Sequence, residues 1–130
     1  MNIAQYENIT ITDMDSAHTS REPGTALHNV HLRLSARPSS DWATDFTITW
    51  KEHIYGTKRK ARMDGATVII TCALEELPEH KAELLKVMAE VDARQQAAAI
   101  QAQKVKEAVE KAARQDRQKI EQAANLFNNG

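Results

Sequence analysis

Residues 57–85 read TKRKARMDGATVIITCALEELPEHKAELL, and this stretch decides the fold. Two runs suited to β-strands, 57–63 and 66–72, lie on either side of Asp-Gly at positions 64–65. Asp-Gly between two such runs predicts a β-hairpin in which both turn residues have positive φ. Pro78 then fits the first turn of a helix, where its missing N–H has no intrahelical partner to lose. The stretch therefore predicts a strand, a tight turn, a second strand and the start of a helix.

The residues that follow predict one long helix. From Glu79 to Phe127 the chain contains no Gly and no Pro, and Ala, Gln, Glu, Lys and Arg dominate. This composition is typical of a long helix. An unbroken helix over 79–125 would be roughly 70 Å long, whereas a strand of ordinary length spans roughly 20 Å. The distal part of the helix must therefore project, fold back after a break or pack on another chain. We expect a small domain over 1–92 and a projecting helical extension over 93–130.

Earlier in the chain, the pattern predicts two more strands. Residues 8–13 and residues 28–35 alternate polar and apolar side chains, which is typical of half-buried strands. Residues 14–25 are rich in Asp, Ser and Thr and contain Pro and Gly, so they favour a loop. The inward-facing residues of the second strand are expected to be Val30, Leu32 and Leu34.

A helix is predicted from about residue 40. Ser39 can cap its N-terminus, and Asp41 suits its first turn. Large apolar residues recur every four positions, which places them on one helical stripe, and Gly56 suits the C-terminal end. The stripe consists of Trp42, Phe46, Trp50 and Ile54. Core packing is the expected role of its aromatic rings.

The element order is therefore ββαββα. This order predicts an α+β fold in which an antiparallel four-stranded sheet carries the helices on one face. The long C-terminal helix is expected to extend beyond that domain.

The long helix is the first candidate for a partner surface. A heptad pattern can be drawn along it, as in a coiled coil. The positions that suit a partner helix are Val91, Ala98, Ala102, Val105, Val109 and Ala112. Gln95 and Asp116 occupy core positions that they suit poorly, and Ile100 and Ile120 fall outside the register.

Charge is segregated along the same helix. Five acids and two bases lie from Glu76 to Asp92, and seven bases and three acids lie from Arg94 to Lys119. This order complements the helix dipole and favours antiparallel pairing of two copies, because unlike charges then face each other. We expect a homodimer or docking on a protein partner; a solvated helix that pairs with nothing is the alternative.

The second candidate surface is the basic strand before the hairpin turn. Lys58, Lys60 and Arg62 share one face at a period of two, and His31 and Arg33 join them if the outer faces align. Such a face can hold phosphates or an acidic segment of a partner. Exposed strand lysines also serve simply to discourage edge-to-edge pairing. The interleaved aromatic residues and GxxG clamp of RNA-binding domains are missing, so nucleic-acid binding is the secondary hypothesis.

No catalytic or metal-binding motif is evident in the sequence. His28 and His31 are expected on opposite faces of one strand, so they do not form a simple chelating pair. The segment that begins at Asp13 lacks the Gly and the Glu of a calcium loop. Cys72, the single cysteine, ends an apolar strand and is expected to be a buried structural thiol. We expect no enzyme, no metal site and no cofactor.

Composition limits the classes of protein to which the chain can belong. The chain has 17 Lys and Arg against 18 Asp and Glu, and its net charge of −1 argues against a general polyanion binder. One cysteine excludes a disulfide framework, and no signal or membrane segment is recognisable, so a cytoplasmic protein is expected. The sequence therefore predicts a non-enzymatic interaction or adaptor module that acts through its long C-terminal helix, with partner and process unspecified.

Overall fold

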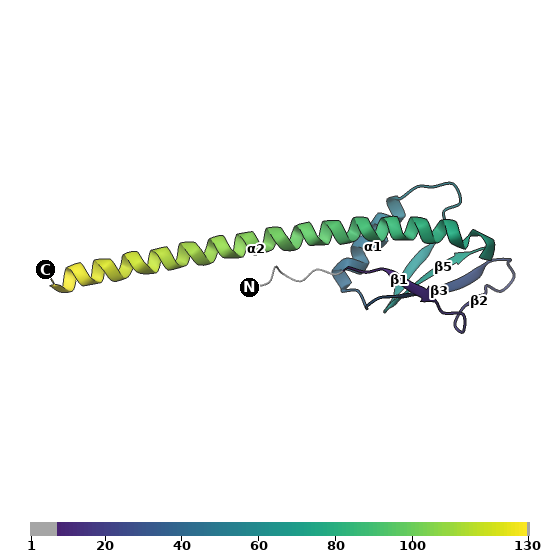
Figure 1. Cartoon of the computed structure of the whole chain (residues 1–130), viewed down its shortest axis with the longest axis horizontal. Helices are drawn as coiled ribbons and strands as arrows, with labels where there is room; N and C mark the ends of the chain where they lie inside the picture. Colours follow the sequence, from purple (N-terminus) through teal and green to yellow (C-terminus); the bar gives the residue numbers. More distant parts are fainter. Residues whose placement is uncertain (1–7, 130) are drawn as a thin grey trace. The chain divides into compact units, whose positions relative to one another are not determined.

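The computed structural model describes residues 8–129, which form an α+β fold with an antiparallel sheet of five strands (Figure 1). The strands are β1 (Ile11–Met14), β2 (Ser20–Arg21), β3 (His28–Leu34), β4 (Ala61–Asp64) and β5 (Thr67–Cys72). Their order is β1-β3-β5-β4, and β2 also pairs with β3. The two apolar strands β3 and β5 are therefore central, and β4 forms an edge of the sheet.

Three helical segments complete the chain. They are α1 (Ser40–Glu52), the short 3-10 helix η1 (Leu74–Glu76) and α2 (Leu77–Asn129). The 53 residues of α2 form one unbroken helix of about 80 Å, because no Gly or Pro follows Pro78 before its end. The chain divides into a compact unit that ends at Gln96 and a second unit that begins at Ala97.

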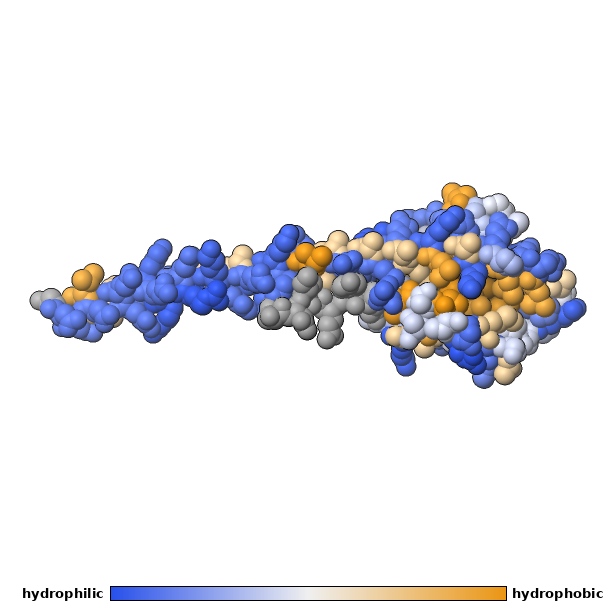
Figure 2. Space-filling view, in the orientation of Figure 1, coloured by the Kyte–Doolittle hydropathy of each residue, from blue (hydrophilic) through white to orange (hydrophobic). Residues whose placement is uncertain are grey.

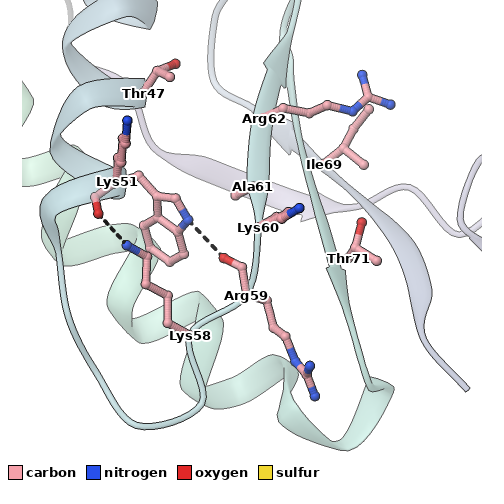
Figure 3. Close-up of a pocket in the computed structure, with 10 residues that line it drawn as sticks. Thr47, Lys51, Lys58, Arg59, Lys60, Ala61, Arg62, Ile69 and Thr71 are labelled. Atoms are coloured by element: carbon pink, nitrogen blue, oxygen red, sulfur yellow. Dashed lines mark hydrogen bonds between the residues drawn. The ribbon is translucent and has the colours of Figure 1, made fainter.

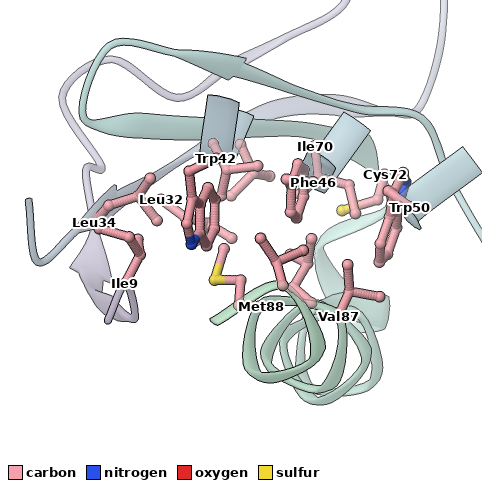
Figure 4. Packing of buried hydrophobic residues seen from close by; sticks show 14 residues of the cluster. Ile9, Leu32, Leu34, Trp42, Phe46, Trp50, Ile70, Cys72, Val87 and Met88 are labelled. Atoms are coloured by element: carbon pink, nitrogen blue, oxygen red, sulfur yellow. The ribbon is translucent and has the colours of Figure 1, made fainter. Parts of the chain in front are cut away.

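The core lies between the sheet and the two α-helices, as Figure 4 shows. The sheet contributes Val30, Leu32, Leu34, Val68, Ile70 and Cys72, α1 contributes Trp42, Phe46 and Trp50, and α2 contributes Leu84, Val87, Met88 and Val91. This arrangement confirms the predicted α+β fold with helices on one face. The buried face of β3 is the one that its alternating pattern predicts.

The prediction for α1 is correct at its start and wrong at its end. The Ser39 hydroxyl accepts a hydrogen bond from the Trp42 N–H, so it is the N-cap. The helix ends at Glu52, and Ile54 is 89% exposed rather than part of the buried stripe. His53 already has an extended backbone, so Ile54 lies beyond the helix and its side chain no longer follows the helical stripe. Gly56 lies in the following turn and does not end the helix.

The hairpin is confirmed, but its turn is shifted by one residue. Asp64 pairs with Thr67, so the turn residues are Gly65 and Ala66. Gly65 has a φ of 59°, and no described residue other than glycine has positive φ. Positive φ at the first turn position alone is the pattern of a type II′ turn, which favours Gly there.

Two strand boundaries and one additional strand also differ from the prediction. The first hairpin strand begins at Ala61 rather than at residue 57, and β1 begins at Ile11 rather than at residue 8. The expected loop over 14–25 contains β2, which has only two residues and pairs with His28 and Asn29. A strand this short has no alternating pattern by which it could be recognised.

Candidate functional site

The sheet face opposite the core carries most of the predicted basic residues. Arg62 pairs with Ile69, and Ile69 pairs with His31. Arg33 pairs with Thr67, while the Thr71 N–H donates to the Lys60 carbonyl. Directly paired residues of an antiparallel sheet point to the same face. The structure therefore brings His31, Arg33, Lys60 and Arg62 onto one face.

Two of the five predicted cations are engaged elsewhere. The Arg33 guanidinium forms ion pairs with Asp13 and, at 3.3 Å, with Asp15. Lys58 precedes β4, donates its Nζ to the Lys51 carbonyl at 2.9 Å and lies 5.6 Å from the centre of the Trp50 ring. Lys58 is therefore held against α1 and is not part of the sheet face.

A groove runs along the edge strand β4, between that strand and α1 (Figure 3). It has a volume of about 640 Å³. The residues that line this β4 groove are Thr47, Trp50, Lys51, Lys58, Arg59, Lys60, Ala61, Arg62, Ile69 and Thr71. Five of them are basic and none is acidic, although the whole chain has a net charge of −1. The basic strand is evident in the sequence, whereas the α1 wall that faces it is not.

Beside the groove lies a chain of four hydrogen-bonded side chains. Arg59 donates Nε and Nη2 to the two Glu76 oxygens, each at 3.0 Å. His80 Nε2 lies 3.0 Å from Glu76 Oε1, and His80 Nδ1 lies 2.7 Å from the Tyr55 hydroxyl. His80 is completely buried. The network ties the segment after α1 to the start of α2.

The electrostatics of this network follow from its contacts. The hydrogen bonds from Arg59 and His80 lower the pKa of Glu76 to about 2, so its carboxylate only accepts hydrogen bonds. Burial raises the pKa of Tyr55 to about 12, so its hydroxyl keeps its proton. In the neutral His80 ring, Nε2–H then donates to Glu76 and Nδ1 accepts from Tyr55. The i,i+4 spacing of Glu76 and His80 is a sequence signal that could have indicated this pair.

We expect the network to make stability depend on pH in the acidic range. The pKa of Glu76 falls from 4.5 to about 2 on folding. Its contribution is therefore fully present above pH 4.5 and is lost as the pH falls toward 2. Melting temperatures measured between pH 5 and pH 2 should fall less steeply in Glu76→Gln than in the wild type. Glu75→Gln, at an exposed neighbour, is the control and should keep the wild-type slope; equal slopes in all three proteins would contradict the assignment.

Cys72 has the properties of a structural thiol. It is buried in the core, and burial raises its pKa to about 11. At neutral pH the thiol is protonated and therefore a poor nucleophile. No group of three or more His, Cys, Asp and Glu side chains is placed to hold a metal ion within residues 8–129.

The second half of α2 carries a different candidate surface. Every residue from Lys104 to Asn129 is exposed. At about 100° per residue, ten positions between 98 and 127 fall within an arc of about 100°. These positions are Ala98, Ala102, Val105, Val109, Ala112, Ala113, Asp116, Ile120, Ala123 and Phe127, and we call them the α2 stripe. Nine of the ten are apolar, and all ten are exposed.

The heptad assignment is wrong at two residues, Val91 and Ile120. Val91 is buried in the core of the compact unit, so it is not available to a partner helix. Ile120, which falls outside the heptad, lies eleven residues after Val109 and returns to the same side of a straight helix. Ile100 remains outside the arc. The surface of this segment is otherwise largely hydrophilic, with an apolar patch near its C-terminal end (Figure 2).

No protein-family model, no curated protein and no solved structure matches the chain. Among the described helices, none is both long and apolar enough to cross a membrane.

Proposed function

We propose that this chain is a non-enzymatic assembly module that pairs through the α2 stripe. The observation that carries the proposal is the exposure of nine apolar residues on one narrow face of a helix. Val109 is 64% exposed and Phe127 is 87% exposed. An isolated helix with a continuous apolar stripe gains stability by burying it against another helix.

The partner that we favour is a second copy in antiparallel orientation. With the pair centred between Ala112 and Ala113, the stripe superposes on itself. The facing pairs would be Ala98–Phe127, Ala102–Ala123, Val105–Ile120, Val109–Asp116 and Ala112–Ala113. Apolar residues face each other in four of these five pairs, and the fifth places Asp116 against Val109. A parallel pair in register would instead bring two Asp116 carboxylates together, which is unfavourable.

Charged substitutions in the stripe should abolish pairing. We expect Val109→Asp combined with Ile120→Asp to raise the dimer dissociation constant at least about a hundredfold, or about 2.8 kcal/mol, because carboxylates would be buried against apolar side chains. Sedimentation equilibrium over a range of protein concentrations would measure this. The control is Gln118→Asp combined with Asn125→Asp. Both positions lie on the opposite side of the helix, so the mass of the assembly in solution should equal that of the wild type. A monomeric wild type would contradict self-pairing.

Cysteine cross-linking would test the orientation. In the proposed register Ala102 faces Ala123, so Ala102→Cys and Ala123→Cys proteins should cross-link when mixed and not when each is alone. A parallel pair would instead cross-link each protein when it is alone. Asp116→Ala should tighten the antiparallel pair, because it removes the only polar side chain of the stripe.

Nucleic-acid binding by the basic face has weaker support. Among the described residues that line the β4 groove, Trp50 is the only aromatic one, and it is 4% exposed. Proteins that bind single-stranded nucleic acid depend on aromatic side chains on which the bases stack. Beside Lys60 and Arg62 the bases would lack such a platform. Phosphate contacts would also weaken steeply with salt, whereas an apolar helix pair should tolerate salt.

A further inference from the structure

The free edge of β4 offers backbone groups to an additional strand. The Thr71 N–H donates to the Lys60 carbonyl, and the register continues through the pair of Arg62 and Ile69. In an antiparallel ladder, alternate residues direct their N–H and C=O groups toward the partner strand. The backbone groups of Ala61 and Met63 therefore point away from β5. None of the described residues forms a backbone hydrogen bond with them from that side.

One end of this edge is already closed. The Trp50 indole Nε1–H of α1 donates to the Arg59 carbonyl at 3.0 Å. This bond satisfies the outward carbonyl just before β4. The unpaired part of the edge is thus limited to Ala61 and Met63, which is enough for a short added strand.

Charge decides which strand fits this edge. Lys58 is held by Lys51 and Trp50, and Arg59 is neutralised by Glu76. Lys60 and Arg62 are exposed, lie two residues apart on one face and form no ion pair within residues 8–129. A second β4 edge would bring these cations against their own copies, which disfavours self-pairing through this edge. Carboxylates on alternate residues of an incoming strand would face them instead.

We propose that the β4 edge binds an extended acidic segment of a partner protein as an additional antiparallel strand. The segment carries acidic residues at every second position, and these face Lys60 and Arg62. The residues between them face the α1 side of the groove, and their backbone groups bond to Ala61 and Met63. This mode of recognition takes affinity from main-chain hydrogen bonds and specificity from alternate side chains.

A peptide-binding experiment tests the proposal on the full chain. The probe is a fluorescein-labelled ten-residue peptide of alternating Glu and Thr, and the readout is fluorescence anisotropy. We expect saturable binding that Lys60→Glu combined with Arg62→Glu weakens at least tenfold. Arg37→Glu combined with Lys81→Glu changes the charge equally at exposed positions away from the groove and should leave binding unchanged. Absence of binding, or equal losses in both double variants, would overturn the proposal.

Two backbone modifications separate strand addition from simple charge attraction. In the proposed register the Thr N–H groups of the peptide face β4, so N-methylation of Thr should weaken binding at least tenfold while N-methylation of Glu should not. Ala61→Pro removes an outward N–H, which an edge strand tolerates, and should also weaken binding while circular dichroism stays unchanged. Insensitivity to both changes would overturn strand addition. Tighter binding of a ten-nucleotide oligothymidylate than of the peptide would overturn it in favour of nucleic acid.

Discussion

Replacement of Phe46 by alanine should lower the free energy of unfolding by about 3–5 kcal/mol. Phe46 is completely buried, and its ring lies between those of Trp42 and Trp50, with centroid distances of 5.8 and 6.2 Å. Both rings are nearly parallel to it. The substitution removes the middle of this stack, and the cavity adds to the lost transfer free energy because neighbouring tryptophans relax only partly.

Urea unfolding followed by tryptophan fluorescence would measure this loss. Both tryptophans belong to the core, so their fluorescence reports the compact unit rather than the exposed second half of α2. Protein concentration must be held constant, because pairing through α2 would itself change the apparent stability. Ile48→Ala is the control, since Ile48 belongs to the same helix and is 53% exposed. It should change the free energy by no more than about 0.5 kcal/mol, and similar losses in both variants would contradict the packing.

Substitution of Asp92 by alanine should cost about 2–4 kcal/mol, because two donors would lose their only acceptor. Asp92 Oδ1 accepts from the Trp42 Nε1–H at 2.9 Å and from the Ile9 N–H at 3.1 Å. Trp42 and Ile9 both belong to the buried core. A single carboxylate oxygen thus joins α2 to α1 and to the segment that leads into β1.

Asp92→Asn separates the loss of the acceptor from the loss of charge. An amide oxygen can take the position of Oδ1 and accept both hydrogen bonds, although neutral acceptors form weaker bonds than ionised ones. We therefore expect stability in the order wild type, Asn, Ala, with Asn nearer the wild type. The same fluorescence assay applies. Equal losses for Asn and Ala would show that charge, and not the hydrogen bonds, is what Asp92 contributes.

Local periodicity predicted the regular elements well. The alternation of β3 and the apolar run of β5 are visible because strand side chains point to opposite faces in turn. The start of α1 was visible because Ser39 carries the chemistry of an N-cap. The end of α1 was not visible, because Ile54 continues the four-residue spacing although the helix has already ended at Glu52.

The candidate surfaces were predictable only in part. The alternation of Lys60 and Arg62 was evident in the sequence, but the wall of the β4 groove comes from a different element, α1, which ends nine positions before β4 begins. The α2 stripe was partly hidden because a heptad excludes Ile120, whereas a straight helix includes it. No local signal linked Asp92 to Trp42, which is 50 positions away.

The sequence by itself determined the α+β class, the approximate positions of the two central strands, the start of α1 and that one helix is too long for its domain. Those features depend on side-chain spacing and backbone preference within about ten residues. Only the tertiary structure decided the strand order β1-β3-β5-β4, the burial of Val91 and the position of β4 at an edge. These features depend on which distant surfaces meet and exclude water, and no local pattern encodes that choice.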